Sequence, residues 1–257
     1  MMVGPCAGPS PTHESVMPHR SDLPLLTSTS AKPELTNAVL RRLPDDERRQ
    51  FLSAGTPIRL ERREILQEAG NPMAVVVFPL SCVVSLQALT ESGSTVEVAM
   101  LGRESVLGFP AGPDSHECPY SITVPIAGQA LRFRPDVLRR AFDQSSTLRR
   151  ILLDQWHALM AEIVRGSACH CFHTQLQRSA RWLLAASERA GLDTLDLSHE
   201  DLGGILGVPR SAVTASAMTL RQAGAIRYHQ GRITIVDRRR LSAFACECHR
   251  DGASPQD

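Results

Sequence analysis

Hydrophobic and polar positions follow two different periods along this chain. Between residues 56 and 133, apolar and polar side chains alternate in short runs that are separated by turns containing Gly or Pro. Before and after this part, apolar positions recur every three or four residues, which is the period of a helix packed on one face. The pattern predicts an α+β chain with a β-rich part near the N-terminus and a helical part after it.

The alternating part predicts a jelly-roll-like β-roll or a β-sandwich, because many short strands with close turns pack in this way. Two short helices, over 35–43 and 44–54, are expected before the strands. The expected strands are 58–60, 65–67, 73–78, 82–89, 95–101, 121–124 and 129–133.

A long amphipathic helix is predicted after a shorter helix that Pro135 opens. Ser145 or Ser146 caps the long helix, which runs to about Gly166. Its apolar spacing is typical of a helix that pairs with a partner helix, and a helix packed on its own domain would show the same spacing. The residues of this apolar seam are Leu148, Leu152, Trp156, Leu159 and Ile163.

The stretch from 197 to 237 predicts a winged helix-turn-helix. Ser198 precedes two acidic residues and is expected to cap a helix that Gly207 ends. Pro209 then begins a second helix, and two alternating runs around a polar corner at 229–231 predict a hairpin. In such a motif the second helix enters the major groove of DNA.

Positive charge is concentrated in the same stretch, whereas the whole chain has a net charge of only +1. A local basic surface is what a protein that binds double-stranded DNA needs. Aromatic residues are scarce, which argues against a platform for single-stranded nucleic acid. Between Gly207 and Arg240 the only acid is Asp237, and the arginines are Arg210, Arg221, Arg227, Arg232, Arg238, Arg239 and Arg240.

Two motifs carry a resemblance to a known family. Residues 197–214 read L-x-x-E-D-L-x-x-x-L-G-V-x-R-x-x-V-T, and residues 220–237 read L-R-Q-A-G-A-I-R-Y-x-x-G-R-I-T-I-V-D. Together they resemble the DNA-binding end of the CRP/FNR family of bacterial transcription regulators, and the strand order resembles the sensor roll of that family. The resemblance implies a homodimer held by the long helix, binding to double-stranded DNA, and contact with RNA polymerase if the protein is an activator.

Five segments follow from the pattern and the resemblance. We expect a disordered tail over 1–31, a cyclic-nucleotide-binding-like β-roll sensor domain over 32–144, a dimerisation helix and hinge over 145–172, a winged helix-turn-helix DNA-binding domain over 173–245, and a C-terminal tail over 246–257. The sequence has no long apolar run and no export signal, and its odd number of cysteines does not form a disulfide framework. These features predict a cytoplasmic protein that does not enter a membrane.

The N-terminal end of the second helix is expected to read base edges. Arg210 can make two hydrogen bonds to guanine, or contact a phosphate instead. Relatives that use an Arg-Glu pair followed by a further Arg carry charge where this chain has Ser211 and Ala215, so its base preference is expected to differ. The expected base-reading residues are Arg210, Ser211, Thr214 and Ala215.

Phosphate contacts are expected from the helix ends and from the wing, where they position the domain without reading sequence. The alternative for Tyr228 is that it packs on the second helix. The expected phosphate-contacting residues are Ser198, Arg221, Arg227, Tyr228 and Arg232.

The roll lacks the residues that the resemblance associates with cyclic nucleotides. Nucleotide-binding members hold the ribose with a Gly-Glu pair and the cyclic phosphate with an Arg, and Leu107 and Tyr120 occupy these places here. Arg103 is a substitute cation, but on a turn beside Glu104 it is expected to be solvated. Cyclic AMP is therefore not expected to bind, and the roll holds another effector or serves only as a scaffold. The candidate effector-pocket residues are Arg103, Leu107, Tyr120 and Ser121.

Two clusters of Cys and His leave a metal- or redox-responsive switch open as the alternative function, and the cofactor stays unknown. An iron–sulfur cluster is not expected, because Cys6 is the only cysteine ahead of the roll. Neither cluster has C-x-x-C spacing, and a Cys-x-Cys pair on a helix points its thiols to different faces, so packing alone would also explain them. The candidate ligands are Cys169, Cys171, His173, Cys246 and Cys248.

An enzyme is the rival class, and the sequence argues against it. A jelly-roll metalloenzyme needs several His and a carboxylate inside the roll, and residues 56–133 contain only His116. No Ser-His-Asp signature or phosphate-binding loop is present either.

Overall fold

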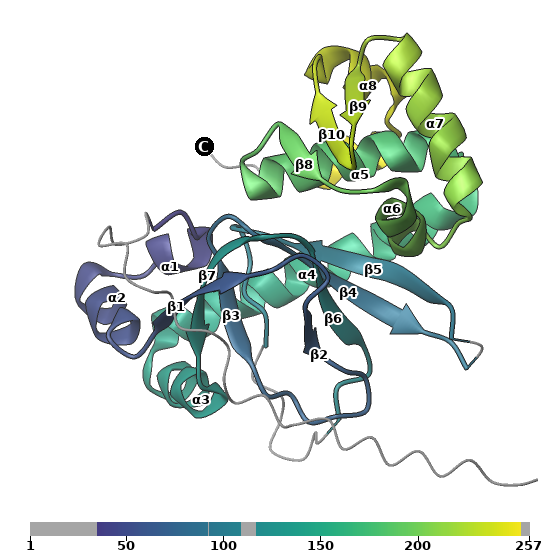
Figure 1. The fold of residues 1–257 in the computed structure, drawn as a ribbon. Helices are drawn as coiled ribbons and strands as arrows, with labels where there is room; N and C mark the ends of the chain where they lie inside the picture. Colours follow the sequence, from purple (N-terminus) through teal and green to yellow (C-terminus); the bar gives the residue numbers. More distant parts are fainter. Residues whose placement is uncertain (1–34, 92, 109–116, 253–257) are drawn as a thin grey trace, which may run out of the picture.

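The computed structural model describes residues 35–91, 93–108 and 117–252. They form a β-roll with flanking helices, a long helix, and a winged-helix domain that lies against one end of the roll (Figure 1). The predicted tail over 1–31 lies outside the described residues, as do Cys6 and His116. No helix in the described part of the chain is both long and apolar enough to cross a membrane.

Seven antiparallel strands form the roll, in two sheets of order β2-β6-β4-β5 and β1-β7-β3. Apolar side chains from both sheets form one buried cluster between them, which is why alternation predicts these strands well. Every predicted strand is confirmed, with ends shifted by a few residues. The strands are β1 (Thr56–Leu60), β2 (Ile65–Gln67), β3 (Val76–Pro79), β4 (Val83–Leu89), β5 (Thr95–Leu101), β6 (Ser121–Ile126) and β7 (Gly128–Phe133).

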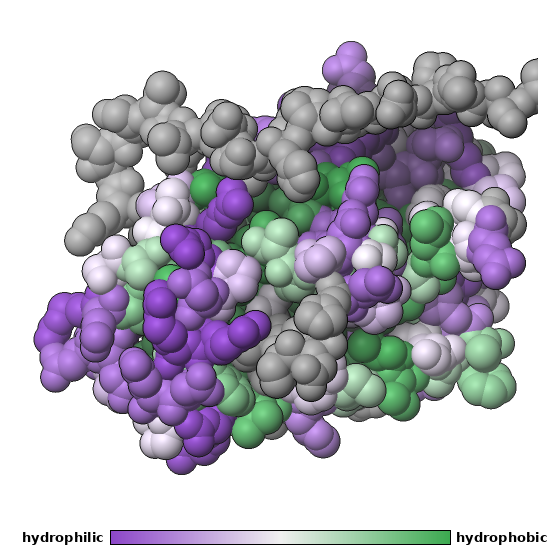
Figure 2. All heavy atoms as spheres, turned by 90° about the horizontal axis from the view of Figure 1, so that it is seen from below, coloured by the Kyte–Doolittle hydropathy of each residue, from purple (hydrophilic) through white to green (hydrophobic). Residues whose placement is uncertain are grey.

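Three short helices close one side of the roll: α1 (Ala38–Arg41), α2 (Asp45–Leu52) and α3 (Pro135–Gln144). They share a second buried cluster with the sheet β1-β7-β3. In this cluster the rings of Phe51 and Phe133 stack with centroids 4.4 Å apart. Seen from below, hydrophilic side chains gather over α2 and α3, on the left of the view (Figure 2). Both helices therefore bury one face against the roll and expose the other.

The long helix α4 (Ser146–Phe172) begins where predicted but ends later. The Ser145 hydroxyl caps it by accepting a hydrogen bond from the amide of Leu148. The helix continues past Gly166, because Gly is tolerated inside a helix that packs on other elements. The connection to the next helix is then only His173 and Thr174, instead of the predicted hinge of several residues.

The predicted seam of α4 needs a correction, because most of it packs within the chain. Leu148 and Leu152 are buried in the cluster shared with α2 and α3, and Leu159 and Ile163 pack against the roll. Only Trp156 lies on the exposed side. The spacing was right for an apolar face, but the roll covers that face. A neighbouring apolar face is exposed, and it consists of Leu153, Trp156, Met160 and Val164.

The C-terminal domain is a winged helix-turn-helix, as predicted. The chain enters through α5 (Gln175–Ala190) and continues with the two helices of the motif, α6 (His199–Leu206) and α7 (Arg210–Gln222). The wing is the hairpin of β9 (Ile226–His229) and β10 (Arg232–Ile235), and Gln230 and Gly231 at its corner both have positive φ angles, 46° and 76°. Three elements were not predicted: β8 (Thr194–Asp196), which adds a third strand, α8 (Arg238–Phe244), and a final 3-10 turn, η1 (Glu247–Gly252).

Candidate nucleic-acid interface

The tight turn between α6 and α7 fixes how the second helix is presented. Ser198 and Asp201 form a capping box at the start of α6, and Gly207 ends the helix with a φ of 64°. Gly203 is needed because a Cβ there would lie 2.9 Å from the carbonyl oxygen of Val208. Sequence determines this turn locally, through one cap and two glycines.

Ser198 was expected to contact a phosphate, but its hydroxyl already bonds within the domain. It donates to the carboxylate of Asp201 and accepts from the amide of the same residue. Ser198 is half-buried as a result. The side chain therefore serves the helix cap.

The second helix buries one face and exposes the other. Val213, Ala217 and Leu220 face the core of the domain. Three of the four predicted base-reading residues, Arg210, Ser211 and Ala215, are exposed near the N-terminal end of α7; further exposed residues on this helix are Met218, Thr219, Arg221 and Gln222. This is the end of the helix that reaches base edges in a helix-turn-helix.

Thr214, the fourth predicted base reader, is half-buried. Its hydroxyl donates to the carbonyl oxygen of Arg210 and lies 3.0 Å from Nδ1 of His199 on α6. The imidazole of His199 stacks on the ring of Tyr228, with centroids 4.1 Å apart. Burial, together with the charge of Arg210, lowers the pKa of His199, so a neutral imidazole is favoured at neutral pH. His199 was missed in the sequence, where it is only the first residue of a helix.

Tyr228 thus packs within the domain. Its ring stacks on His199 of α6, and it lies against the core cluster that includes Val213 and Leu220 of α7, in line with the alternative. Arg221 on α7 and the two wing arginines differ from Tyr228. Arg221, Arg227 and Arg232 are exposed, and within the described part of the chain they form no salt bridge. By contrast, Arg238 on α8 pairs with Asp193 at 2.9 Å.

Arg240 also serves the domain, because it bonds to the carbonyl oxygen of Ala223 at 3.2 Å and pairs with Asp237. Two of the seven arginines therefore hold α8 in place, and the positive charge available to a partner is smaller than the sequence indicated.

The winged-helix domain is fixed to the roll through its first two helices. Arg62 and Arg63, in the β1–β2 turn, bond to the carboxylate of Asp201 at 3.2 and 2.7 Å. The indole Nε1 of Trp182 on α5 donates to Glu97 on β5 at 2.9 Å. Burial raises the pKa of Glu97 to about 7, although the Trp182 hydrogen bond acts in the opposite direction.

A half-buried arginine links the turn after β5 to α5. Arg189 bonds to Glu104 at 2.8 Å and to Glu162 of α4 at 2.7 Å. Although burial acts to lower the pKa of Arg189, the two carboxylates raise it above its usual range. Gly102 makes this approach possible, since a Cβ there would lie 2.4 Å from the Arg189 Cβ. Arg103 extends to Gly191 at the end of α5, so it points out of the roll.

Comparison with known families decides what this domain is. Residues 177–244 match the family model of the Crp-like helix-turn-helix domain. This part of the chain is similar to that family over α5, both helices of the motif and the wing. No curated protein sequence matches the chain significantly.

Solved structures extend the likeness over both domains of the CRP/FNR fold. A CRP/FNR-family transcriptional regulator from Eubacterium rectale is 14% identical, with a TM-score of 0.59 over 82% of this chain and 99% of the other. FixK2 from Bradyrhizobium japonicum is 20% identical, with a TM-score of 0.59 over 75% and 98%. A CRP-family regulator from Thermus thermophilus is 17% identical, with a TM-score of 0.61 over 73% and 95%. The chain has the CRP/FNR fold, and its helix-turn-helix supports assignment to that family.

In the CRP/FNR roll of this chain, the predicted effector residues do not form a cationic pocket. Leu107 is buried in the core and pairs with Val77 as an isolated β-bridge. Burial raises the pKa of Tyr120 to about 12, so its phenol stays neutral. Ser121 accepts a hydrogen bond from the amide of Ala69. Arg103 is exposed, as expected for a residue on this turn, and its guanidinium lies beside Gly191 and not inside the roll, so it is not a substitute cation there.

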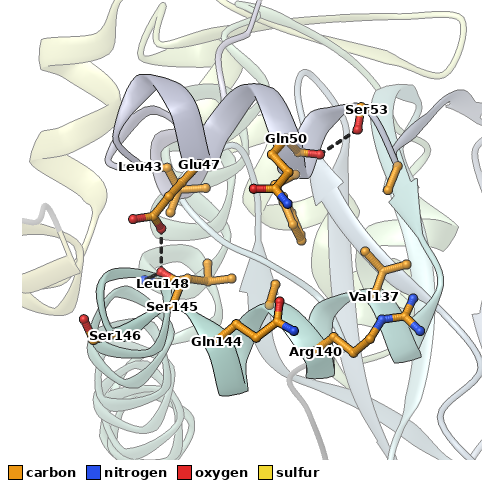
Figure 3. A pocket seen from close by; sticks show the side chains of 13 residues that line it. Leu43, Glu47, Gln50, Ser53, Val137, Arg140, Gln144, Ser145, Ser146 and Leu148 are labelled. Atoms are coloured by element: carbon orange, nitrogen blue, oxygen red, sulfur yellow. Dashed lines mark hydrogen bonds between the residues drawn. The ribbon is translucent and has the colours of Figure 1, made fainter.

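A cavity of about 570 Å³ lies elsewhere, between α2, α3 and the start of α4 (Figure 3). Glu47 spans one end of it, accepting a hydrogen bond from the Ser145 hydroxyl, and Gln50, Arg140 and Gln144 line it. None of the predicted effector residues lines this cavity.

The two Cys/His clusters meet in space. The ligand atoms of Cys169, His173, Cys246 and Cys248 all lie within 4.8 Å of one another. Cys171, the fifth predicted ligand, is exposed on another face of α4 and stays apart from them. The rule that Cys-x-Cys on a helix diverges is confirmed for residues 169 and 171. It does not apply to 246 and 248, because Cys246 precedes η1.

Proposed function

We propose that this chain is a homodimeric, sequence-specific transcription regulator that acts on double-stranded DNA in the cytoplasm and does not respond to cyclic AMP. The observation that carries the proposal is the exposed N-terminal end of α7, where Arg210, Ser211 and Ala215 face away from the domain core. If the protein activates transcription, RNA polymerase is its further partner.

Base reading rests on these three side chains. Arg210 suits guanine, the Ser211 hydroxyl suits either a donor or an acceptor, and the Ala215 methyl suits the methyl group of thymine. Thr214 helps to hold the start of α7 in place, because its hydroxyl bonds to the Arg210 carbonyl and to His199. A mainly uncharged set beside one arginine favours an operator with few guanine contacts per half-site.

Phosphate contacts rest on Arg221, Arg227 and Arg232, whose side chains are exposed on α7 and the wing. Ser198 and Tyr228 contribute indirectly, since one caps α6 and the other stacks on His199.

The dimer rests on the outer face of α4. Leu153, Trp156, Met160 and Val164 recur at spacings of three and four and are exposed, at 50%, 44%, 43% and 64%. An exposed apolar stripe on a helix is the pattern of a helix–helix interface. A two-fold axis along α4 would place two α7 helices for successive major grooves.

Electrostatics supports the part of the proposal that concerns cyclic AMP. Removing a phosphate anion from water without a matched cation costs several kcal/mol. Leu107 and Tyr120 carry no positive charge at neutral pH, and Arg103 extends to α5 instead of into the roll. Calorimetry should show no heat of binding with cyclic AMP; a micromolar dissociation constant would overturn this part of the proposal.

Selection of bound sites from random duplex DNA tests the DNA-binding part. The wild type should enrich one two-fold symmetric site, and Arg210→Ala should lose that preference by about 5- to 100-fold in affinity. The matched control is Arg49→Ala, which removes an exposed arginine from α2 on the roll. The proposal fails if Arg210→Ala keeps the affinity and the site preference of the control.

A further inference from the structure

We infer that Cys169, His173, Cys246 and Cys248 bind one zinc ion, which ties the C-terminal segment to the end of α4. Two of these residues lie at the C-terminal end of α4, and two lie just after α8. Their ligand atoms lie within 4.8 Å of one another. This juxtaposition of one imidazole and three thiols comes from segments 77 residues apart.

The separations suit tetrahedral coordination. The Sγ atoms of Cys169 and Cys246 are 3.5 Å apart, and Sγ of Cys248 is 3.7 Å from Nδ1 of His173. Zinc binds thiolate at about 2.3 Å and imidazole at about 2.0–2.1 Å, so tetrahedral ligand atoms lie roughly 3.5–3.8 Å apart. Cys₃His is one of the ligand sets of structural zinc sites, and it leaves no open position for a substrate.

His173 is oriented as a zinc ligand. Its Nε2 lies 3.1 Å from the carboxylate of Glu247, which leaves Nδ1 directed at Cys248. Ligating histidines commonly donate their second ring N–H to a carboxylate, which fixes the tautomer and makes the ligating nitrogen more basic. Glu247 therefore acts as a positioning residue.

The neighbouring candidates are excluded by direction. Cys169 and His173 are four residues apart at the end of α4 and share a face, whereas Cys171 is two residues from each and is exposed. The Nδ1 of His170 lies 2.7 Å from the carbonyl oxygen of Gly166 and is committed there. His249 is also excluded, because it pairs with Glu188. Four residues of this part of the chain therefore remain as ligands.

The zinc ion would hold both ends of the winged-helix domain together. Cys169 and His173 stand at its entrance from α4, and Cys246 and Cys248 stand at its exit after α8. Binding closes a loop that contains α5, α6, α7 and α8, and it fixes that loop to the helix that carries the exposed apolar stripe. The metal site does not depend on the proposed function. Its consequence, that zinc sets the angle of α7 relative to α4, rests on that function.

Metal content tests the site directly. Full-length protein purified with a thiol reductant and without chelator should contain one zinc per chain by elemental analysis. Cys248→Ser and His173→Ala should lose most of it, whereas Cys171→Ser, on the same helix but outside the site, should keep it. Reconstitution with Co²⁺ gives a second readout, because thiolate-to-cobalt charge-transfer absorption should appear in the wild type and in Cys171→Ser and weaken in Cys248→Ser.

Two results would overturn the site. One is a wild-type protein that holds less than about one zinc in ten chains after zinc is added, with the same value in all variants. The other is a Cys169–Cys246 disulfide, found by mass spectrometry in protein kept under reductant. Copper(I) in place of zinc would overturn the choice of metal.

The domain-fixing role has its own measurements. Removing zinc with a strong chelator should lower Tm by about 5–10 °C, and Tm should return to its original value when zinc is added. Cys171→Ser should behave like the wild type. Operator affinity should fall at least tenfold on chelation. If zinc binds stoichiometrically and raises Tm while operator affinity is unchanged, the consequence for α7 is wrong and the metal site stands.

Discussion

The N-terminal end of α7 and the turn at residues 102–104 each contain an arginine that the sequence offers as a ligand contact, and this chain uses the two regions in opposite ways. On α7, Arg210 and Ser211 are exposed and point to a partner outside the chain. In the turn, Glu104 bonds to Arg189 and Arg103 extends to Gly191, so both side chains meet the winged-helix domain. One region keeps its side chains available, and the other joins the two domains.

The difference shows that two regions of one fold can diverge independently. A side chain already bonded inside the chain must break that bond before it can bind a ligand, and for a buried ion pair this is costly. The turn therefore acts as part of the domain contact. The contact holds α5 and, through α5, the helix-turn-helix, so under the proposed function the roll would influence DNA binding through this contact.

Arg189→Met should give the largest effect, because it leaves the carboxylates of Glu104 and Glu162 without their shared cation. The Glu162 side chain is only 17% exposed, whereas that of Glu104 is 38% exposed and partly screened by solvent, so we expect a loss of about 2 kcal/mol in the free energy of unfolding. Arg42→Met is the matched control, since it removes an exposed ion pair with Asp154 and should cost less than about 1 kcal/mol, the value of surface pairs. Urea unfolding followed by circular dichroism compares the two. Equal stabilities would mean that the turn does not fix the domains.

Met160→Asp should dissociate the dimer, because a carboxylate would enter the exposed apolar face of α4. An effect of at least about 100-fold in the dimerisation constant is expected, comparable to burying an unpaired charge. Leu159→Asp is the comparison variant, because Leu159 packs against the chain's own roll. This change should therefore lower Tm. Sedimentation and thermal unfolding separate the two outcomes. A wild type that is monomeric at micromolar concentration would contradict the dimer.

Glu97→Gln should alter the pH dependence of stability. The pKa of Glu97 is raised from 4.5 to about 7, so its protonated form favours the folded state. The stability that it contributes is present below pH 4.5 and is lost as pH rises toward 7. An amide keeps an acceptor for Trp182 and removes the titration, so the variant should gain on the order of 2 kcal/mol over the wild type between about pH 5 and 8. Parallel stability curves across this range would show that Glu97 does not titrate there.

Arg232→Ala should give the smallest effect, a uniform weakening of DNA binding. Loss of one phosphate contact should lower the slope of log affinity against log salt by about 0.9 without changing base preference. Arg139→Ala, an exposed arginine on α3, is the control and should leave the slope unchanged. A change of preferred sequence with the salt slope intact would place Arg232 on a base instead.

Local sequence determined most of the elements. Short alternating or apolar runs between turns predicted the strands of the roll. The cap at Ser198 with the stop at Gly207 predicted α6, because a cap and a left-handed glycine act within a few residues. The short elements β8 and α8 escaped, since three or seven residues carry too little periodicity. β8 is held by pairing with β10, and α8 is held by packing on α5. Both contacts join segments that are distant in sequence.

By itself, the sequence determined which faces of this protein are apolar, where most of its longer helices begin, and that its C-terminal part is a winged helix-turn-helix. Only the tertiary structure decided which of those faces is covered and which polar groups meet. The seam on α4 illustrates the first, because periodicity predicts an apolar face but not which element packs against it. Cys169 and Cys246 illustrate the second, because spacing along the chain says nothing of segments that the fold brings together across 77 residues. Periodicity acts over a few residues, whereas burial and coordination depend on contacts that exist only once the chain has folded.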